Sequence, residues 1–263
     1  QGEALLATVS RLNGGFGLPP GPVPADAVSG GLAGLAKTAG LEWPAVHCKA
    51  LDLAPEVDDP EKAAQLIVDE LLVDGPVEVG VTGQGLQTLK LTEARLSEDE
   101  LPPPLAVGDL VVISGGARGV TAEAAVALAS SCRATLLLLG RSALAEAEPA
   151  WLSGLSSEAD IKQGLAANAT QALKPRALED QYQQVLRGRE IANNLQRIRD
   201  AGGQVVYRSV DLRDAAAVSG IIEEIRSEYG PVRGLIHGAG VLADRLIEDK
   251  TSEQFAEVYS TKV

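Results

Sequence analysis

The sequence predicts an α/β fold in which helices cover both faces of a doubly wound parallel sheet. Short apolar runs alternate with helical stretches, and a glycine cluster directly follows the apolar run 110–113. Strands and helices that alternate at this rhythm form βαβ units with parallel strands. A content of 45% hydrophobic residues and 28 glycines is typical of a globular protein of this class.

Charge and composition exclude several classes of function. The chain has 23 Lys and Arg against 36 Asp and Glu, a formal charge of −13, so we expect no nucleic-acid partner. No apolar stretch approaches the roughly 18 residues of a membrane span, and no secretory signal is evident. The two cysteines, Cys48 and Cys132, form no CxxC pair. We therefore expect a cytoplasmic location, no membrane contact and no metal centre.

A run of prolines divides the chain into two segments. Residues 102–104 are all proline, so 101–106 is predicted to be an extended linker. It separates a first segment, 1–100, from a second, 107–263. The sequence contains no methionine, so we expect the chain to be a piece of a longer polypeptide.

The first segment alternates predicted strands and helices but shows no catalytic constellation. Strands are expected at 5–12, 47–53, 77–81 and 86–91, and helices at 27–39 and 58–72. Asp59 is a suitable N-cap, followed by Pro60 at the first helical position. His47 and Cys48 are neighbours on a strand and so point to opposite faces, which favours packing roles over a dyad.

The second segment is predicted to supply the main parallel sheet. We expect strands at 110–113, 135–139 and 205–210 with a fourth around 235–236, and helices at 118–130, 189–200 and 215–229. Residues 142–187 form a connection far longer than the usual 2–6 residues, with helical stretches such as 178–186. This connection is either a surface insertion or a docking element for a partner.

The glycine-rich run 114–121 carries the strongest functional signal. It lies between a buried strand and a helix, where Gly115 permits a tight turn and Gly119 lets the backbone approach a pyrophosphate. Gly116, Arg118 and Val120 complete the candidate turn, whose helix N-terminus attracts anions. Thr121 stands where a third glycine is usual, which weakens the match. The alternative is a tight turn without a ligand, and the context favours a dinucleotide site.

Two arginines favour NADPH as the dinucleotide. Arg141, followed by Ser142, ends the second strand, where such folds meet the adenosine ribose. An acidic residue there would accept from a 2′-hydroxyl, whereas an arginine accommodates a 2′-phosphate. Arg118 adds a second positive charge. The alternative is two solvated surface arginines.

The ends of the third and fourth strands supply the remaining candidates. Asp211, next to Leu212, either caps the following helix or accepts from the adenine amino group. The run Gly238-Ala239-Gly240 would let a nicotinamide ring lie against backbone. His237 has no carboxylate or nucleophile in register and is interpreted as structural.

Several runs together resemble a known family. SGGARGV (114–120), LLGRS (138–142), VDLRD (210–214), GLIHGAGVLAD (234–244) and STKV (260–263) are similar to the ketoreductase domain of type I polyketide synthases, within the short-chain dehydrogenase/reductase superfamily. SGGARGVTAE (114–123), LRGREIANNLQRI (186–198) and LAGLAKTAGLEWPAVHCKALDL (32–53) resemble the ketoreductase of polyunsaturated fatty acid synthases. The resemblance implies a Rossmann-like catalytic subdomain preceded by a truncated, non-catalytic Rossmann-like structural subdomain.

The resemblance also implies a reaction. A ketoreductase of this family transfers hydride from NADPH to the β-ketone of an acyl thioester on an acyl carrier protein, within a megasynthase whose other domains are partners. Its members use Lys, Ser, Tyr and Asn, and Lys262 matches the lysine. The Ser, Tyr and Asn would lie beyond Val263, so the chain alone is expected to be inactive.

A second feature of the family concerns stereochemistry. Leu242-Ala243-Asp244 stands where an LDD triplet marks one facial selectivity, with alanine in place of the first aspartate. Asp244 is thus a candidate for orienting the substrate, and the resemblance implies an alcohol of R configuration.

Two further hypotheses remain open. The chain could be a non-catalytic structural or docking module of a megasynthase with a reductase-like fold. It could also belong to a reductase of free small molecules, which the structural subdomain disfavours. The glycine-rich turn and Arg141 favour the ketoreductase, because a silent copy has no need of phosphate ligands.

Overall fold

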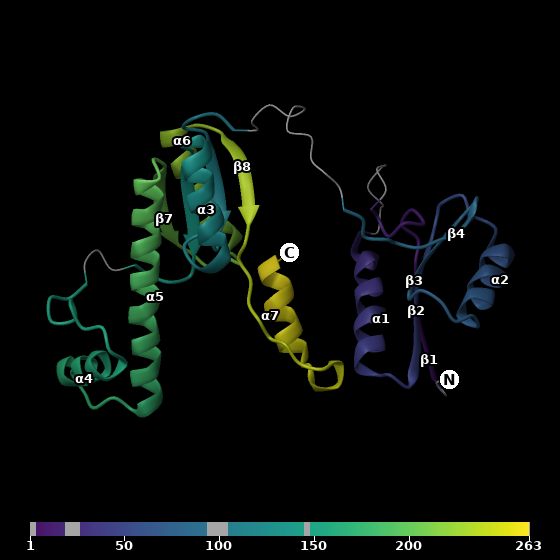
Figure 1. Ribbon diagram of the computed structural model, residues 1–263, viewed down its shortest axis with the longest axis horizontal. Coiled ribbons are helices and arrows are strands. Elements are labelled where there is room, and N and C mark those ends of the chain that lie inside the picture. Colours follow the sequence, from purple (N-terminus) through teal and green to yellow (C-terminus); the bar gives the residue numbers. More distant parts are fainter. Residues whose placement is uncertain (1–3, 19–26, 94–104, 145–147, 263) are drawn as a thin grey trace. The chain divides into compact units, whose positions relative to one another are not determined.

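The computed structural model describes residues 4–18, 27–93, 105–144 and 148–262 (Figure 1). Contacts divide the chain into two compact units, residues 1–97 with 244–250, and residues 98–243 with 251–263. Most of the predicted linker 101–106 lies outside the described residues. The segment 244–250, which the sequence places in the second segment, belongs to the first unit.

The first unit contains a small, mostly parallel sheet. Its strands are β1 (Ala4–Ser10), β2 (Val46–Leu53), β3 (Glu78–Thr82) and β4 (Gly85–Gln87), in the order β1-β2-β3-β4. The first three strands pair in parallel, and β4 turns back antiparallel to β3. The strands thus follow one another across this sheet in sequence order, without the reversal that defines a doubly wound sheet.

Two helices cover the two faces of the first sheet. The alanine-rich α1 (Gly31–Glu42), preceded by η1 (Ala27–Gly30), packs Ala33 and Ala36 against β2. The other face is covered by α2 (Pro60–Leu71) through Leu66, Ile67 and Leu71. The Asp59 carboxylate accepts from the backbone N–H groups of Glu61 and Lys62, which confirms it as the N-cap.

A buried carboxylate organises the glycine-rich loop after β1. Asp52 is fully buried and accepts hydrogen bonds from the N–H groups of Leu12 and Phe16, both at 2.8 Å, and from the Ser10 hydroxyl at 2.9 Å. The loop therefore directs these donors at an internal anion.

The second unit contains the larger parallel sheet. Its strands β5 (Leu110–Ser114), β6 (Thr135–Gly140), β7 (Gln204–Ser209) and β8 (Val232–His237) are ordered β7-β6-β5-β8, and every pairing is parallel. The chain moves outward from β5 to β7 and then crosses back to β8. This confirms the predicted doubly wound topology.

Alternate residues of the central strands pack on opposite faces of this sheet. Val111 and Leu138 face α3 (Gly119–Cys132) and α5 (Pro175–Asp200), which run side by side in front of the sheet (Figure 1). Val112 and Leu137 pack instead with residues of α6 (Ala215–Tyr229). Both faces are thus covered, which explains the continuous apolar runs of β5 and β6.

The long connection between β6 and β7 is largely helical. It contains α4 (Glu158–Asn168) and a single 26-residue helix, α5. The sequence suggested separate helical stretches at 178–186 and 189–200, but they belong to one continuous helix. Its C-terminal half packs on the sheet core through Ile191, Leu195 and Ile198.

The chain beyond β8 contributes to both units. Segment 244–250, with η2 (Ile247–Asp249), is held in the first unit by the Glu42 carboxylate, which accepts from the N–H of Ile247 at 2.6 Å. The last helix, α7 (Ser252–Lys262), belongs to the second unit. Among the residues that the structure describes, no helix is long and apolar enough to cross a bilayer.

Candidate cofactor-binding site

A cleft of about 650 Å³ opens at the carboxyl ends of the strands of the second sheet. The crevice at this edge, where the strand order reverses, is where open α/β sheets bind ligands. Nine predicted cofactor-binding residues line the cleft: Gly115, Arg118, Arg141, Ser142, Asp211, Leu212, Gly238, Ala239 and Gly240. Nine of the twelve predicted cofactor-binding residues therefore lie on one surface, among the nineteen residues that line the cleft.

The floor of the cleft is the turn between β5 and α3. Gly115 has a φ of 70°, and a Cβ there would lie 2.8 Å from the backbone nitrogen of Ala239. A Cβ at Gly116 would lie 2.6 Å from the Ile113 side chain. Gly115 thus keeps the turn close to the loop after β8, whereas Gly116 packs on the core and does not line the cleft.

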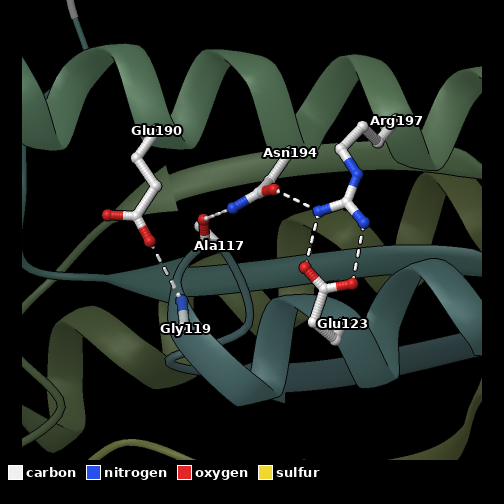
Figure 2. Close-up of polar contacts among 6 residues, drawn as sticks. All are labelled: Ala117, Gly119, Glu123, Glu190, Asn194 and Arg197. Carbon is white, nitrogen blue, oxygen red and sulfur yellow. Dashed lines mark hydrogen bonds and ion pairs between the residues drawn. The ribbon is translucent and has the colours of Figure 1, made fainter.

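The N-terminus of α3 is occupied by a side chain from α5. The Glu190 carboxylate accepts the N–H of Gly119 at 3.1 Å (Figure 2) and the Nε–H of Arg118 at 2.6 Å. Burial acts to raise the pKa of Glu190, but these hydrogen bonds outweigh it and hold the pKa below its usual value. Val120 is 87% exposed and lies outside the cleft lining.

The missing third glycine of the turn is compensated elsewhere. Thr121 lines the cleft, and a Cβ at Gly238 would lie 2.5 Å from its side chain. A third glycine in the turn normally allows the helix to pack closely on its neighbours. Here the helix has Thr121 at that position, and the loop after β8 makes room for its side chain with Gly238.

Arg141 and Ser142 follow β6 on one wall of the cleft. The Tyr207 hydroxyl donates to the Ser142 carbonyl at 2.6 Å and fixes the path of this segment. Partial burial raises the pKa of Tyr207, and the charge of Arg118 acts in the opposite direction. Arg118 and Arg141 both line the cleft.

Asp211 is not the cap of the following helix. The carboxylate of Asp214 caps α6 by accepting the N–H of Ala217. Asp211 instead accepts from the side chain and backbone of Arg213, and these bonds lower its pKa to about 2. Of the two roles that the sequence left open, helix capping is excluded.

His237 takes part in a hydrogen-bond network at the base of the cleft. Its Nδ1 lies 2.7 Å from the Ser114 hydroxyl, which also accepts the N–H of Ala239 at 3.3 Å. The network ties β5 to the loop after β8, as expected for a structural histidine.

Lys262 and Asp244 lie in different units. A Cβ at Gly240 would lie 3.2 Å from Cε of Lys262, so the lysine side chain lies against the loop after β8. The neighbouring Thr261 lines the cleft. Asp244 is exposed and begins the segment that belongs to the first unit.

Several residues at the cleft were not predicted. Gln184, Arg187 and Ile191 line it from α5, at helical spacing on one face. Glu190 contacts the turn itself although it is 71 residues away in sequence. Helical periodicity through 184–191 was the only signal available, and it does not say which element the helix approaches.

Comparison with known proteins gives a consistent result. The family model described as KR domain matches residues 110–263, more than half of the chain. The whole chain is 34% identical to a tenth of a polyunsaturated fatty acid synthase polypeptide from a Thraustochytrium species. It is 27% identical, over 89% of its length, to 4% of polyketide synthase PksN from Bacillus subtilis.

Solved structures agree on the fold. An A1-type ketoreductase matches with a TM-score of 0.69 at 23% identity, over 98% of this chain and 45% of that one. A ketoreductase domain from the bacillaene assembly line matches with a TM-score of 0.60 at 24% identity, over 100% of this chain and 49% of that one. The chain thus spans about half of these structures. With its Rossmann-like fold, the chain belongs to the KR domain family of ketoreductases, as its motifs indicated.

Proposed function

We propose that the chain forms the NADPH-binding part of a ketoreductase that reduces a β-ketoacyl thioester on an acyl carrier protein. The observation that carries this proposal is the cleft at the switch point of the second sheet, which gathers the glycine-rich turn, Arg118 and Arg141. The names of the matched proteins are those of synthases and ketoreductases, in agreement with this reaction.

The residues of the cleft fit a dinucleotide. Gly115 and the run Gly238-Ala239-Gly240 line the cleft and have almost no side chain there, so a ligand could approach the backbone closely. Arg118 and Arg141 would hold the adenosine phosphate, and the loop after β8 would support the nicotinamide half. The bound cofactor would supply hydride to the ketone.

Lys262 is proposed to bind the nicotinamide ribose and to lower the pKa of a tyrosine that donates the proton. Its position against Gly240 supports this role. The family resemblance assigns only this one of the four catalytic residues to the present sequence.

The specificity for NADPH is tested by titrating NADPH and NADH against the chain and against Arg141→Ala. Loss of one charge-assisted phosphate contact costs about 1.5–3 kcal/mol, which is roughly a 10- to 100-fold weaker affinity for NADPH. NADH affinity should be unchanged, and Arg199→Ala on exposed α5 surface is the control. Equal affinities of the unaltered chain for both nucleotides would contradict the proposal.

We also propose that the product is the R alcohol, on the basis of Leu242-Ala243-Asp244. A loop carboxylate beside the substrate entrance can direct which face of the ketone meets the hydride. Chiral chromatography of the product, made by a polypeptide that includes the remaining catalytic residues, tests it. An S alcohol would refute the assignment.

A further inference from the structure

One carboxylate occupies two of the donors that a cofactor phosphate would need. Glu190 accepts the N–H of Gly119 at 3.1 Å, as Figure 2 shows. It also accepts the Nε–H of Arg118 at 2.6 Å. Backbone N–H groups at a helix N-terminus and arginine side chains are the usual phosphate ligands of such turns. The protein therefore places a negative charge of its own at the edge of the proposed phosphate site.

Two neighbours of Glu190 on α5 also hold this helix against the turn and against α3. One turn further along α5, the buried Asn194 donates to the carbonyl of Ala117 at 3.0 Å (Figure 2). Arg197 then forms a two-pronged pair with Glu123 of α3, with both contacts at 2.7 Å. These contacts hold α5 against the turn whether or not residue 190 carries a charge.

The pair between Glu190 and Arg118 is itself easily exchanged. The two side chains are 39% and 45% exposed, respectively. Ion pairs in contact with water contribute little to stability, so a competing anion can replace one partner at small cost. Arg118 also lines the cleft, where a ligand can reach it.

We infer that Glu190 competes with the cofactor phosphate for Arg118 and for the N–H of Gly119, and so sets the affinity of the site for phosphate-bearing nucleotides. The inference rests on the proposed function, since it concerns the same cleft. When NADPH binds, Arg118 exchanges the carboxylate for the phosphate, and Glu190 remains as a nearby like charge that weakens the complex.

The test is Glu190→Gln, which keeps an oxygen that can accept from Gly119 but removes the charge. We expect NADPH to bind about 3- to 10-fold more tightly, the effect of removing one partly screened like charge. NADH should gain less, because it carries no 2′-phosphate. The gain should shrink at about 0.5 M salt, where charges are screened within a few ångströms.

Two further variants separate this role from a structural one. Glu179→Gln, on the same helix and paired only with Lys162 and Gln183 among the contacts described, should leave both affinities unchanged. Asn194→Ala removes an anchor of the turn and should weaken NADPH binding. If Glu190 served only to hold the turn, as Asn194 does, both variants should weaken binding, so opposite signs at 190 and 194 identify the competitor.

A double variant tests whether Glu190 affects NADPH affinity through Arg118. In an Arg118→Ala background, Glu190→Gln should produce less tightening, because one of its two shared donors is gone. Glu190→Ala should tighten binding in the same direction as Glu190→Gln and replaces it if that variant folds poorly.

The outcomes are separable. If the unaltered chain binds NADPH and Glu190→Gln binds it equally or more weakly, the inference is overturned and the proposed function stands. If the unaltered chain binds neither NADPH nor NADH, the proposed function fails, and the inference fails with it.

Discussion

At the residue scale, the site depends on positions where backbone approaches backbone. The turn between β5 and α3 was predictable because an apolar strand, a glycine cluster and a helix follow one another locally in the sequence. The partners of that turn were not, because Ala239 and Glu190 reach it from distant elements. Similarly, Asp211 and Asp214 are equivalent in the sequence pattern, and only the fold shows which one caps α6.

Gly115→Ala is expected to damage the site. Its φ of 70° and the 2.8 Å approach to Ala239 leave no room for a methyl group. We expect a loss of about 1–3 kcal/mol in the free energy of unfolding, together with weaker NADPH binding. Gly220→Ala is the control, because a Cβ there meets nothing within 4 Å, and an exposed helical site should gain about 0.5–1 kcal/mol. Chemical denaturation measures both, and an unaffected Gly115→Ala protein would contradict the packing described.

The carboxyl group of Asp211 is expected to titrate at about pH 2, below its usual value of 3.8, because Arg213 donates to it. Since the folded-state pKa is depressed, the pair contributes to stability above pH 3.8 and loses that contribution as the pH falls through about 2. NMR titration of the side-chain carboxyl carbon measures it. Arg213→Gln should return the midpoint toward 3.8, and a normal midpoint in the unaltered protein would show that the pair does not form.

At the element scale, the full length of α5 could not be predicted from the sequence. The sequence indicated separate helical stretches at 178–186 and 189–200, which the structure joins into one helix. The first half contacts α4, where Glu179 pairs with Lys162. Further along, the Arg189 side chain donates to the carbonyls of Leu152 and Leu155 in the chain before α4. The same helix contacts the glycine-rich turn one residue later, through Glu190. The long connection is therefore attached directly to the proposed cofactor site.

The prediction at this scale concerns the strand β8. It ends the order of the second sheet within the described residues, and Leu235 is 72% exposed on it. An exposed apolar edge strand pairs readily with other chains. Leu235→Lys should therefore reduce self-association in light scattering at a given protein concentration. Leu41→Lys, on exposed helix surface, is the control. If both variants reduced self-association equally, the added charge would be the cause, and the prediction for the edge strand would be contradicted.

At the scale of the whole molecule, the two-part organisation followed from the proline run and from two successive βαβ patterns. What the sequence could not show is that 244–250 returns to the first unit, because the hydrogen bond between Glu42 and Ile247 carries no sequence signature. Every residue that lines the cleft belongs to the second unit. Cofactor binding is thus expected to stabilise the second unit and to leave the first unit unchanged.

Hydrogen exchange with and without NADPH tests the central claim, that the cleft of the second unit binds this cofactor. With NADPH in excess, amides at 115–121, 139–143 and 238–240 should exchange more slowly, as should those at 211–212. Amides of 27–93 should exchange at the same rate in both samples. NADH at equal concentration should give weaker protection. An unchanged exchange pattern in the second unit, or protection confined to the first, would contradict the account.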